Sequence, residues 1–500
     1  MLATPSAAPV AEPVRPASES PSSAPAASGD VAGDVSIAEL DGLRGLACLT
    51  VVLGHFDAVT SRVSFFPAWQ AMVSTLNASM GVICFFTLSG FLLTYLAAIE
   101  FRRTGRFDVR AFYVRRVFRI WPLHFTVLAV VMLLTAPFAP LALDARAYQW
   151  SLEHLWMYVL FLNNWSLAFT GVGGYVDLSQ PMLNISWSIA IEEQIYLVFP
   201  LLMLGILGAG RRRQVGVIAA VIAVAVAYRL IALLWWGPVQ HGRAATIYMG
   251  TLSYLDVVLA GGLAGWLCAQ RRLAGLAKNR PDESQSAASQ PATSTRRRPL
   301  PLWLGPVILA GLVAVSLAWR YIETFGSTPL DVVVYPLMGA VFGGGMLWIA
   351  EHPGSWLARS LRWPPLRVLG TLSFGIYLWH FTARTITYRA FDLLHFRPKG
   401  QEQVDMLVAC TFLTYLALSV LLATLSYALV ERKFLALRRR LSQRSSQHAG
   451  RPGRPAPTPA QRAPSTDGRM APAPRFLPVV AACIAVAGLG VGLAQVLVRR

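Results

Sequence analysis

Long apolar stretches alternate with short basic segments along the chain of 500 residues. A helix needs about 20 apolar residues to cross the hydrocarbon core of a bilayer, and eleven runs near that length can be placed. They cover residues 40–59, 80–99, 119–138, 186–207, 215–236, 249–269, 302–320, 332–350, 371–390, 405–430 and 476–498. The pattern predicts an all-α polytopic membrane protein, with a ten-helix core in residues 38–432 and one further C-terminal helix in residues 476–500.

The distribution of Lys and Arg supports this number of spans. Short cytoplasmic loops of membrane proteins carry an excess of basic residues, and here strongly basic loops alternate with loops that hold one or two basic residues. The basic clusters lie in residues 102–119, 211–213, 271–298, 359–367 and 432–475. This alternation places the N-terminus in the cytoplasm. The net charge of +19 is spread over these loops and forms no basic domain, so we expect no nucleic-acid partner.

Three segments outside the spans have compositions that do not favour a packed core. Residues 1–37, a linker at 273–300 and a basic linker at 433–475 are rich in Ala, Pro, Ser, Gln or Arg, so we expect them to be disordered and cytoplasmic. Residues 152–165 are too short to span, and we expect this segment to be interfacial or re-entrant. The five cysteines show neither paired nor metal-ligand spacing, so neither a disulfide nor a metal site is predicted.

Ionisable residues inside the apolar runs carry the functional signal. In the first span, LDGLRGLACLTVVLGHF, Arg44 and His55 are eleven positions apart, or about 16 Å along a helix. We therefore expect Arg44 at the inner interface and His55 near the midplane. A titratable group at that depth is costly and points to function, although a snorkelling arginine and a hydrogen-bonded packing histidine would also explain the pair.

Two other spans bring polar groups to similar depths. Tyr377 and His380 are three positions apart and share a helix face, as do Glu192 and Tyr196 at a spacing of four. An intramembrane carboxylate needs a partner or water. We expect these side chains and His55 to form one polar site inside the bundle.

Three arginines stand at the cytoplasmic mouth of the third span: Arg115, Arg116 and Arg119. Arginine binds phosphate through two parallel hydrogen bonds. Ordinary anchoring by positive residues explains any one of them equally well, but Arg44 is expected at the same level. The coincidence favours a phosphate site at the inner mouth.

These strings resemble those of the membrane-bound acyltransferase 3 family. The similarity covers about residues 38–432 and rests on five strings in the same order: DGLRGLACLTVVLGH, FFTLSGFLL, RRVFRIWPLHF, WSIAIEEQIYLVFP and SFGIYLWH. The resemblance implies ten helices in the bacterial inner membrane and a cytoplasmic acyl-CoA donor, usually acetyl-CoA. It implies O-acylation of a carbohydrate or glycosylated acceptor, with acyl-CoA as a co-substrate and no bound cofactor.

The resemblance also assigns roles by position. His55 corresponds to the family's catalytic histidine and Glu192 to its membrane glutamate, and Arg44, Arg116 and Arg119 correspond to its functional arginines. We expect the arginines, with Arg115, to hold the donor phosphates while an acceptor hydroxyl loses its proton to His55 as general base.

The remaining polar residues have less certain chemistry in the sequence. His380 is the rival base, at a depth similar to that of His55. Tyr196 and Tyr377 are expected to donate hydrogen bonds near the developing oxyanion, and Glu192 to orient or stabilise a positive partner. A route in which His55 itself carries the acyl group stays open.

Some family members carry an extracytoplasmic esterase-like domain after an eleventh helix. This sequence stops at Arg500 and has no GDS-type serine motif, so we expect any such partner to be a separate protein. A transporter or flippase for a glycan or lipid-linked substrate is the main alternative, because midplane charges and Gly-rich helices also suit a substrate pathway. The sequence has no inverted-repeat symmetry, which favours the enzyme.

The topology is tested by reporter fusions. Alkaline phosphatase fused at Ser286 should be inactive because that linker faces the cytoplasm, whereas fusions within residues 60–79 should be active. Activity at Ser286 would overturn the topology and the assignment of the arginines to the donor side.

Overall fold

The structure is a computed structural model that describes residues 37–60, 78–139, 141, 145–168, 181–235, 246–278, 299–325, 329–393, 400–448 and 476–499. Across these ranges the chain is helical and holds no strand, as the apolar pattern predicts. The tail at 1–36, most of the 273–300 linker and residues 449–475 lie outside the described parts, and the expectation of disorder there stays a prediction.

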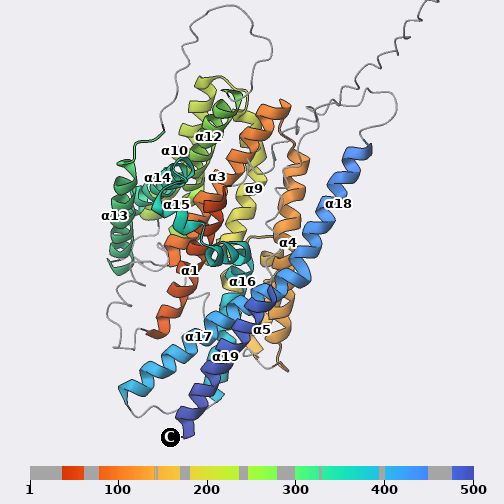
Figure 1. The fold of residues 1–500 in the computed structure, drawn as a ribbon, viewed down its shortest axis with the longest axis vertical. Coiled ribbons are helices and arrows are strands. Elements are labelled where there is room, and N and C mark those ends of the chain that lie inside the picture. The colour runs from red at the N-terminus through yellow and green to blue at the C-terminus, as the bar shows by residue number, and fades with distance from the viewer. Residues whose placement is uncertain are drawn as a thin grey trace, which may run out of the picture.

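The N-terminal half begins with three long helices and a group of short ones (Figure 1). These are α1 (Ala38–Thr60), α3 (Ala78–Thr104), α4 (Val109–Leu134), α5 (Ala145–Glu153), α6 (Leu155–Val159), α8 (Pro181–Asn184), α9 (Trp187–Ile206) and α10 (Arg211–Trp235). The C-terminal half continues with η1 (Thr251–Tyr254), α12 (Leu255–Lys278), α13 (Leu304–Phe325), α14 (Leu330–Glu351), α15 (Trp356–Leu361), α16 (Pro364–Leu393), α17 (Gln401–Ser426), the π turn η2 (Tyr427–Glu431), α18 (Arg432–His448) and α19 (Phe476–Arg499).

Each of the eleven predicted spans overlaps a helix. Within the described residues, eight helices are long and apolar enough to cross a membrane, so the chain is an integral membrane protein of helical type. The three other predicted spans are α1, α16 and α19. Helices α1 and α16 carry several charged residues, and α19 qualifies only as a shorter apolar helix over Pro478–Gly490. The number of eleven membrane crossings therefore stays a prediction.

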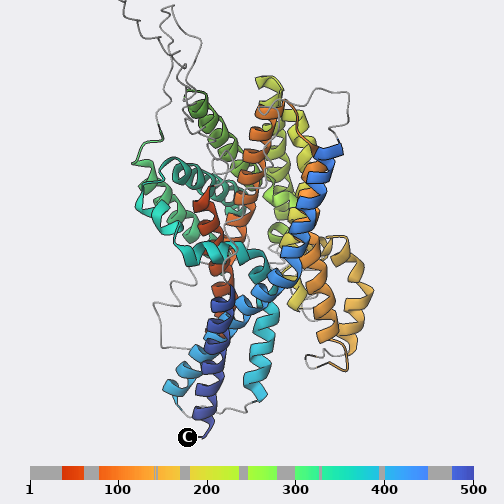
Figure 2. The same ribbon diagram turned by 45° about the vertical axis from the view of Figure 1, so that its right-hand side comes forward.

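Close backbone contacts join α1 to α16. A Cβ atom added at Gly370 would overlap the carbonyl oxygen of Asp41, and one added at Gly45 would overlap that of Leu366. Small residues allow membrane helices to approach in this way. Helix α16 also packs on α17, and α17 on α19; Figures 1 and 2 show these helices projecting together at one end of the molecule. The close contact at Gly45 and Gly370 sets the register of α1 against α16.

The basic linker needs a correction in its first part. The expectation of disorder from residue 433 is wrong for α18, which continues the chain of α17 through the π turn η2. Leu, Ala and Arg favour helix, and an already formed helix extends more easily than a new one nucleates. The helix packs along α4, with ring contact between Phe118 and Phe434, and both views show the two side by side (Figures 1 and 2).

A buried ion pair fastens α10 to α12. Arg229 is fully buried and bonds both carboxylate oxygens of Asp256, and it also donates to the carbonyl oxygen of Ser253 at 2.7 Å. Its guanidinium lies 5.4 Å from the ring centre of Tyr335. Because each charge is paired with the other, this pair reads as structural, although the Nε atom of Arg229 is buried without a hydrogen-bond partner among the described residues.

The close contact of α1 and α16 is tested by adding one methyl group. Gly370→Ala should lower the free energy of unfolding by about 1–3 kcal/mol, since the new Cβ must displace the Asp41 backbone. Gly344→Ala on α14 is the control, because no atom lies within 4 Å of a Cβ there, and Ala is favoured over Gly in a helix by about 0.5–1 kcal/mol. Thermal unfolding in detergent measures both. Equal stability of the two variants would contradict the close contact.

Candidate functional site

Two histidines from helices far apart in sequence meet between α1 and α16. The Nδ1 atom of His55 lies 3.1 Å from the Nε2 atom of His380, and the ring centres are 5.0 Å apart. Phe381 packs edge-on against both rings, with centre distances of 4.8 and 4.9 Å. His380 is fully buried, whereas His55 is half-buried. The sequence placed them at a similar depth, and the structure makes them a hydrogen-bonded pair.

Arg384 completes this group and was missed by the sequence analysis. Its guanidinium donates to the carbonyl oxygen of His55 at 2.9 Å and lies 4.3 Å from the ring centre of Phe381. It follows His380 by four positions, so the two side chains share a helix face. That spacing was the signal that could have found it.

Tyr377 lies next to the histidine pair and is tied to α9. Its hydroxyl is 2.5 Å from the Oγ atom of Ser188 and donates to the carbonyl oxygen of Ile185 at 3.3 Å. The backbone carbonyl of Tyr377 is 2.6 Å from Nδ1 of His380. The tyrosine therefore fixes the buried histidine with its main chain and faces the neighbouring helix with its hydroxyl.

A second polar group surrounds Glu192 on α9. The hydroxyl of Tyr196 donates to its Oε2 atom at 3.2 Å and lies 2.7 Å from the Oγ atom of Ser89. The spacing of four residues thus produces the contact expected from the sequence. Arg44 and two arginines of α4 supply the positive charge around this carboxylate.

The arginines of this second group come from α1 and α4. Arg44, Arg116 and Arg119 all interact electrostatically with Glu192, and the guanidinium of Arg116 lies 5.4 Å from the ring centre of Tyr196. Within the described residues, the Nε atoms of Arg44 and Arg116 are buried without a hydrogen-bond partner. A buried donor without a partner is costly, so these two arginines keep capacity for an acceptor such as a phosphate oxygen.

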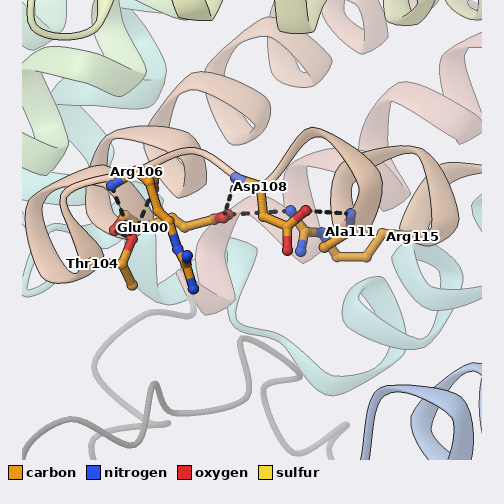
Figure 3. A network of polar contacts seen from close by, with 6 residues as sticks. All are labelled: Glu100, Thr104, Arg106, Asp108, Ala111 and Arg115. Atoms are coloured by element: carbon orange, nitrogen blue, oxygen red, sulfur yellow. Dashed lines mark hydrogen bonds and ion pairs between the residues drawn. The ribbon is translucent and has the colours of Figure 1, made fainter. Parts of the chain in front are cut away.

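Arg115 is placed apart from this group. It forms an ion pair with Glu100 at 3.3 Å, and the other oxygen of Glu100 accepts from the backbone nitrogen of Asp108 at 2.9 Å. Asp108 in turn caps α4 by accepting from the backbone nitrogen of Ala111. Figure 3 shows this network in the turn between α3 and α4. The ion pair accounts for Arg115 as part of the turn, whereas the sequence grouped it with the donor arginines.

Glu431 is a further residue that the sequence analysis missed. It ends the π turn η2, which packs against α4, and it interacts electrostatically with Arg119 and Arg44. Such π turns occur often at functional sites. The sequence alone gave no sign of a role for Glu431, because its position beside α4 depends on the π turn η2.

One pocket, with a cavity volume of about 70 Å³, lies between α1, α3, α9 and α16. Arg44 and Glu192 line it at one end, and Ser188 and Tyr377 line it as well, with apolar walls that include Phe85. Tyr377 is one turn before His380 on α16, but neither His55 nor His380 belongs to the pocket lining.

Comparison with known proteins indicates the family of the chain. Residues 37–429 match the family model of the acyltransferase 3 family, described as an acyltransferase domain. A peptidoglycan O-acetyltransferase, OatA, of Listeria monocytogenes is 25% identical over 79% of this chain and 55% of its own length. A putative O-acetyltransferase of Staphylococcus aureus strain COL is 24% identical over 80% of this chain and 57% of its own. The O-acetyltransferase OatA of Staphylococcus aureus strain NCTC 8325 is 24% identical over 78% and 56%.

The chain spans little more than half the length of the curated relatives that it matches. No solved structure matches. The family model nevertheless covers most of the sequence, including all the residues of both polar groups except Glu431. The chain therefore belongs to the acyltransferase 3 family.

Proposed function

We propose that the chain is a membrane O-acyltransferase, which moves an acyl group, most simply acetyl, from cytoplasmic acyl-CoA to a hydroxyl of a carbohydrate acceptor. The observation that carries the proposal is the pocket between Arg44 and Tyr377. Its lining includes Arg44 of the arginine group and Tyr377, one turn before His380, and helix α1 carries both Arg44 and His55. The names of the relatives, which are O-acetyltransferases, support the same reaction and favour a cell-wall glycan as acceptor.

The inner arginine group is proposed as the donor-phosphate site. Arg44, Arg116 and Arg119 converge there, and Glu192 and Glu431 offset part of their charge. Phosphate oxygens would accept charge-assisted hydrogen bonds from the N–H groups of these arginines. The pantetheine arm would then lie in the pocket, with its thioester directed toward the outer group.

The distance between the two groups fits this placement. Arg44 and His55 are eleven residues apart on the continuous helix α1, or about 16 Å along its axis. An extended pantetheine arm spans a gap of that order. The phosphates would therefore stay at the cytoplasmic mouth, in an N-terminus-inside orientation in the bacterial inner membrane, while the acceptor enters from the outer side.

The chemistry proposed at the outer end is general-base catalysis. His55 removes the acceptor's hydroxyl proton as the oxygen attacks the thioester carbon. The new carbon–oxygen bond forms, the carbon–sulfur bond breaks, and the imidazolium returns the proton to the leaving thiolate, which gives the free thiol of CoA. Tyr377 and Ser188 are the hydroxyls next to the pocket end that could donate to the developing oxyanion.

The class of function is tested by label transfer. Purified protein in lipid vesicles is given acetyl-CoA labelled in the acetyl group and peptidoglycan fragments as acceptor. Label found in an alkali-labile ester on the glycan supports the enzyme. Uptake of the glycan into vesicles without any ester would support a carrier and contradict the proposed reaction.

The donor site is tested at α4. Arg116→Ala and Arg119→Ala should raise the KM for acyl-CoA by about 10- to 100-fold, because each loses charged hydrogen bonds worth about 1.5–3 kcal/mol. The acceptor KM should change little, and Lys should restore only part of the loss because it lacks the planar fork. Arg110→Ala, an exposed position on the same helix, is the control. Equal effects on donor and acceptor would indicate membrane anchoring instead.

The base is tested at α1. His55→Ala should lower kcat by about 10²- to 10⁴-fold, which is the usual contribution of a general base, and leave acyl-CoA binding nearly unchanged. His352→Ala is the matched control, because the Nδ1 atom of His352 bonds a carbonyl one turn earlier on α14, away from the pocket lining. Retention of most turnover by His55→Ala would contradict the catalytic assignment.

A further inference from the structure

The hydrogen bonds of the histidine pair determine where its protons lie. Nδ1 of His380 is 2.6 Å from the carbonyl oxygen of Tyr377. A carbonyl oxygen only accepts, so this Nδ1 atom carries a proton. His380 is fully buried and lies near the charged guanidinium of Arg384, so a second positive charge there would be costly. In its neutral form, the Nε2 atom of His380 has a lone pair and no proton.

That lone pair determines which ring nitrogen of His55 carries the proton. Nε2 of His380 is 3.1 Å from Nδ1 of His55, and two lone pairs facing each other would repel. Nδ1 of His55 must therefore be the donor.

We propose that His380 is a positioning residue, which holds neutral His55 with its proton on Nδ1 and so leaves Nε2 of His55 as the only basic nitrogen of the pair. Both nitrogens of His380 are committed to hydrogen bonds, so His380 is not the base that touches the acceptor. The carbonyl oxygen of Tyr377 is the last acceptor in this chain of hydrogen bonds. The assignment of tautomers stands on geometry, and its catalytic meaning rests on the proposed function.

Two further contacts hold the ring and the main chain of His55. Phe381 packs edge-on against both imidazoles, and Arg384 holds the main-chain carbonyl of His55 at 2.9 Å. When Nε2 takes the hydroxyl proton, the imidazolium keeps its Nδ1 proton in the bond to His380. The proton on Nε2 then goes to the leaving thiolate, so no proton is passed to His380.

Histidine acylation by diethyl pyrocarbonate tests the tautomers without turnover. The reagent acylates an unprotonated ring nitrogen, and mass spectrometry of the folded wild-type protein locates the label. His55 should be labelled and His380 should not. His154 and His352, whose Nδ1 atoms also bond a carbonyl one turn earlier, calibrate the reactivity of partly exposed rings. Labelling of His380 ahead of His55 would overturn the proposal.

Two substitutions test the positioning role in catalysis. His380→Leu removes the acceptor for the Nδ1 proton, and misplacing a catalytic histidine's tautomer costs up to about 10⁴-fold in kcat. His380→Gln can present its amide oxygen to the same proton, so it should retain clearly more kcat than the Leu variant. The KM for acyl-CoA should stay near the wild-type value in both. Equal loss in both variants, or a loss expressed in KM, would contradict a positioning role.

The two proposals fail in different ways. If His55 is labelled as expected but excess acetyl-CoA does not slow its labelling and no acetyl ester forms, the tautomer assignment holds and the acyl-transfer proposal fails. If esters form but His380→Leu retains wild-type kcat, the proposed enzyme stands and the positioning role of His380 is wrong.

Discussion

The structure depends on the direct backbone contact between α1 and α16. Gly45 and Gly370 let the two helices touch where any side chain would separate them. Because both helices are rigid, this contact fixes the positions of His55 and His380 further along, where their rings form a hydrogen bond. A shift of one helix by a single residue would turn the ring on that helix by about 100° around the helix axis and break the pair.

Ionisable groups inside a bilayer need partners, and this chain supplies them at two levels of α1. At the inner level, carboxylates of Glu192 and Glu431 face arginines of α1 and α4. At the outer level, the histidines bond each other and the carbonyl of Tyr377. The inner group is charged and suits phosphates, and the outer group is arranged as a neutral base. We propose that this separation accommodates the two ends of an acyl-CoA donor.

Local sequence predicted much of this arrangement. Apolar runs predicted the helices, and spacings of three or four residues predicted that Tyr377 with His380, and Glu192 with Tyr196, share a face. Contacts between distant segments were less accessible. The sequence grouped Arg115 with its neighbours on α4, but the turn to α3 pairs it with Glu100. The role of Glu431 depends on a π turn that composition does not encode. The expectation of disorder from residue 433 overlooked the helix propensity of the first residues of α18 and their packing against α4.

The central claim is that one donor molecule connects the two groups, and a structure of the protein with a non-hydrolysable acyl-CoA analogue in lipid nanodiscs measures it most directly. The proposed path predicts the phosphates against Arg44, Arg116 and Arg119, the pantetheine arm in the pocket lined by Glu192 and Tyr377, and the acyl carbonyl beside Nε2 of His55. Phosphates bound on another surface, or an acyl group that ends away from the histidine pair, would contradict it.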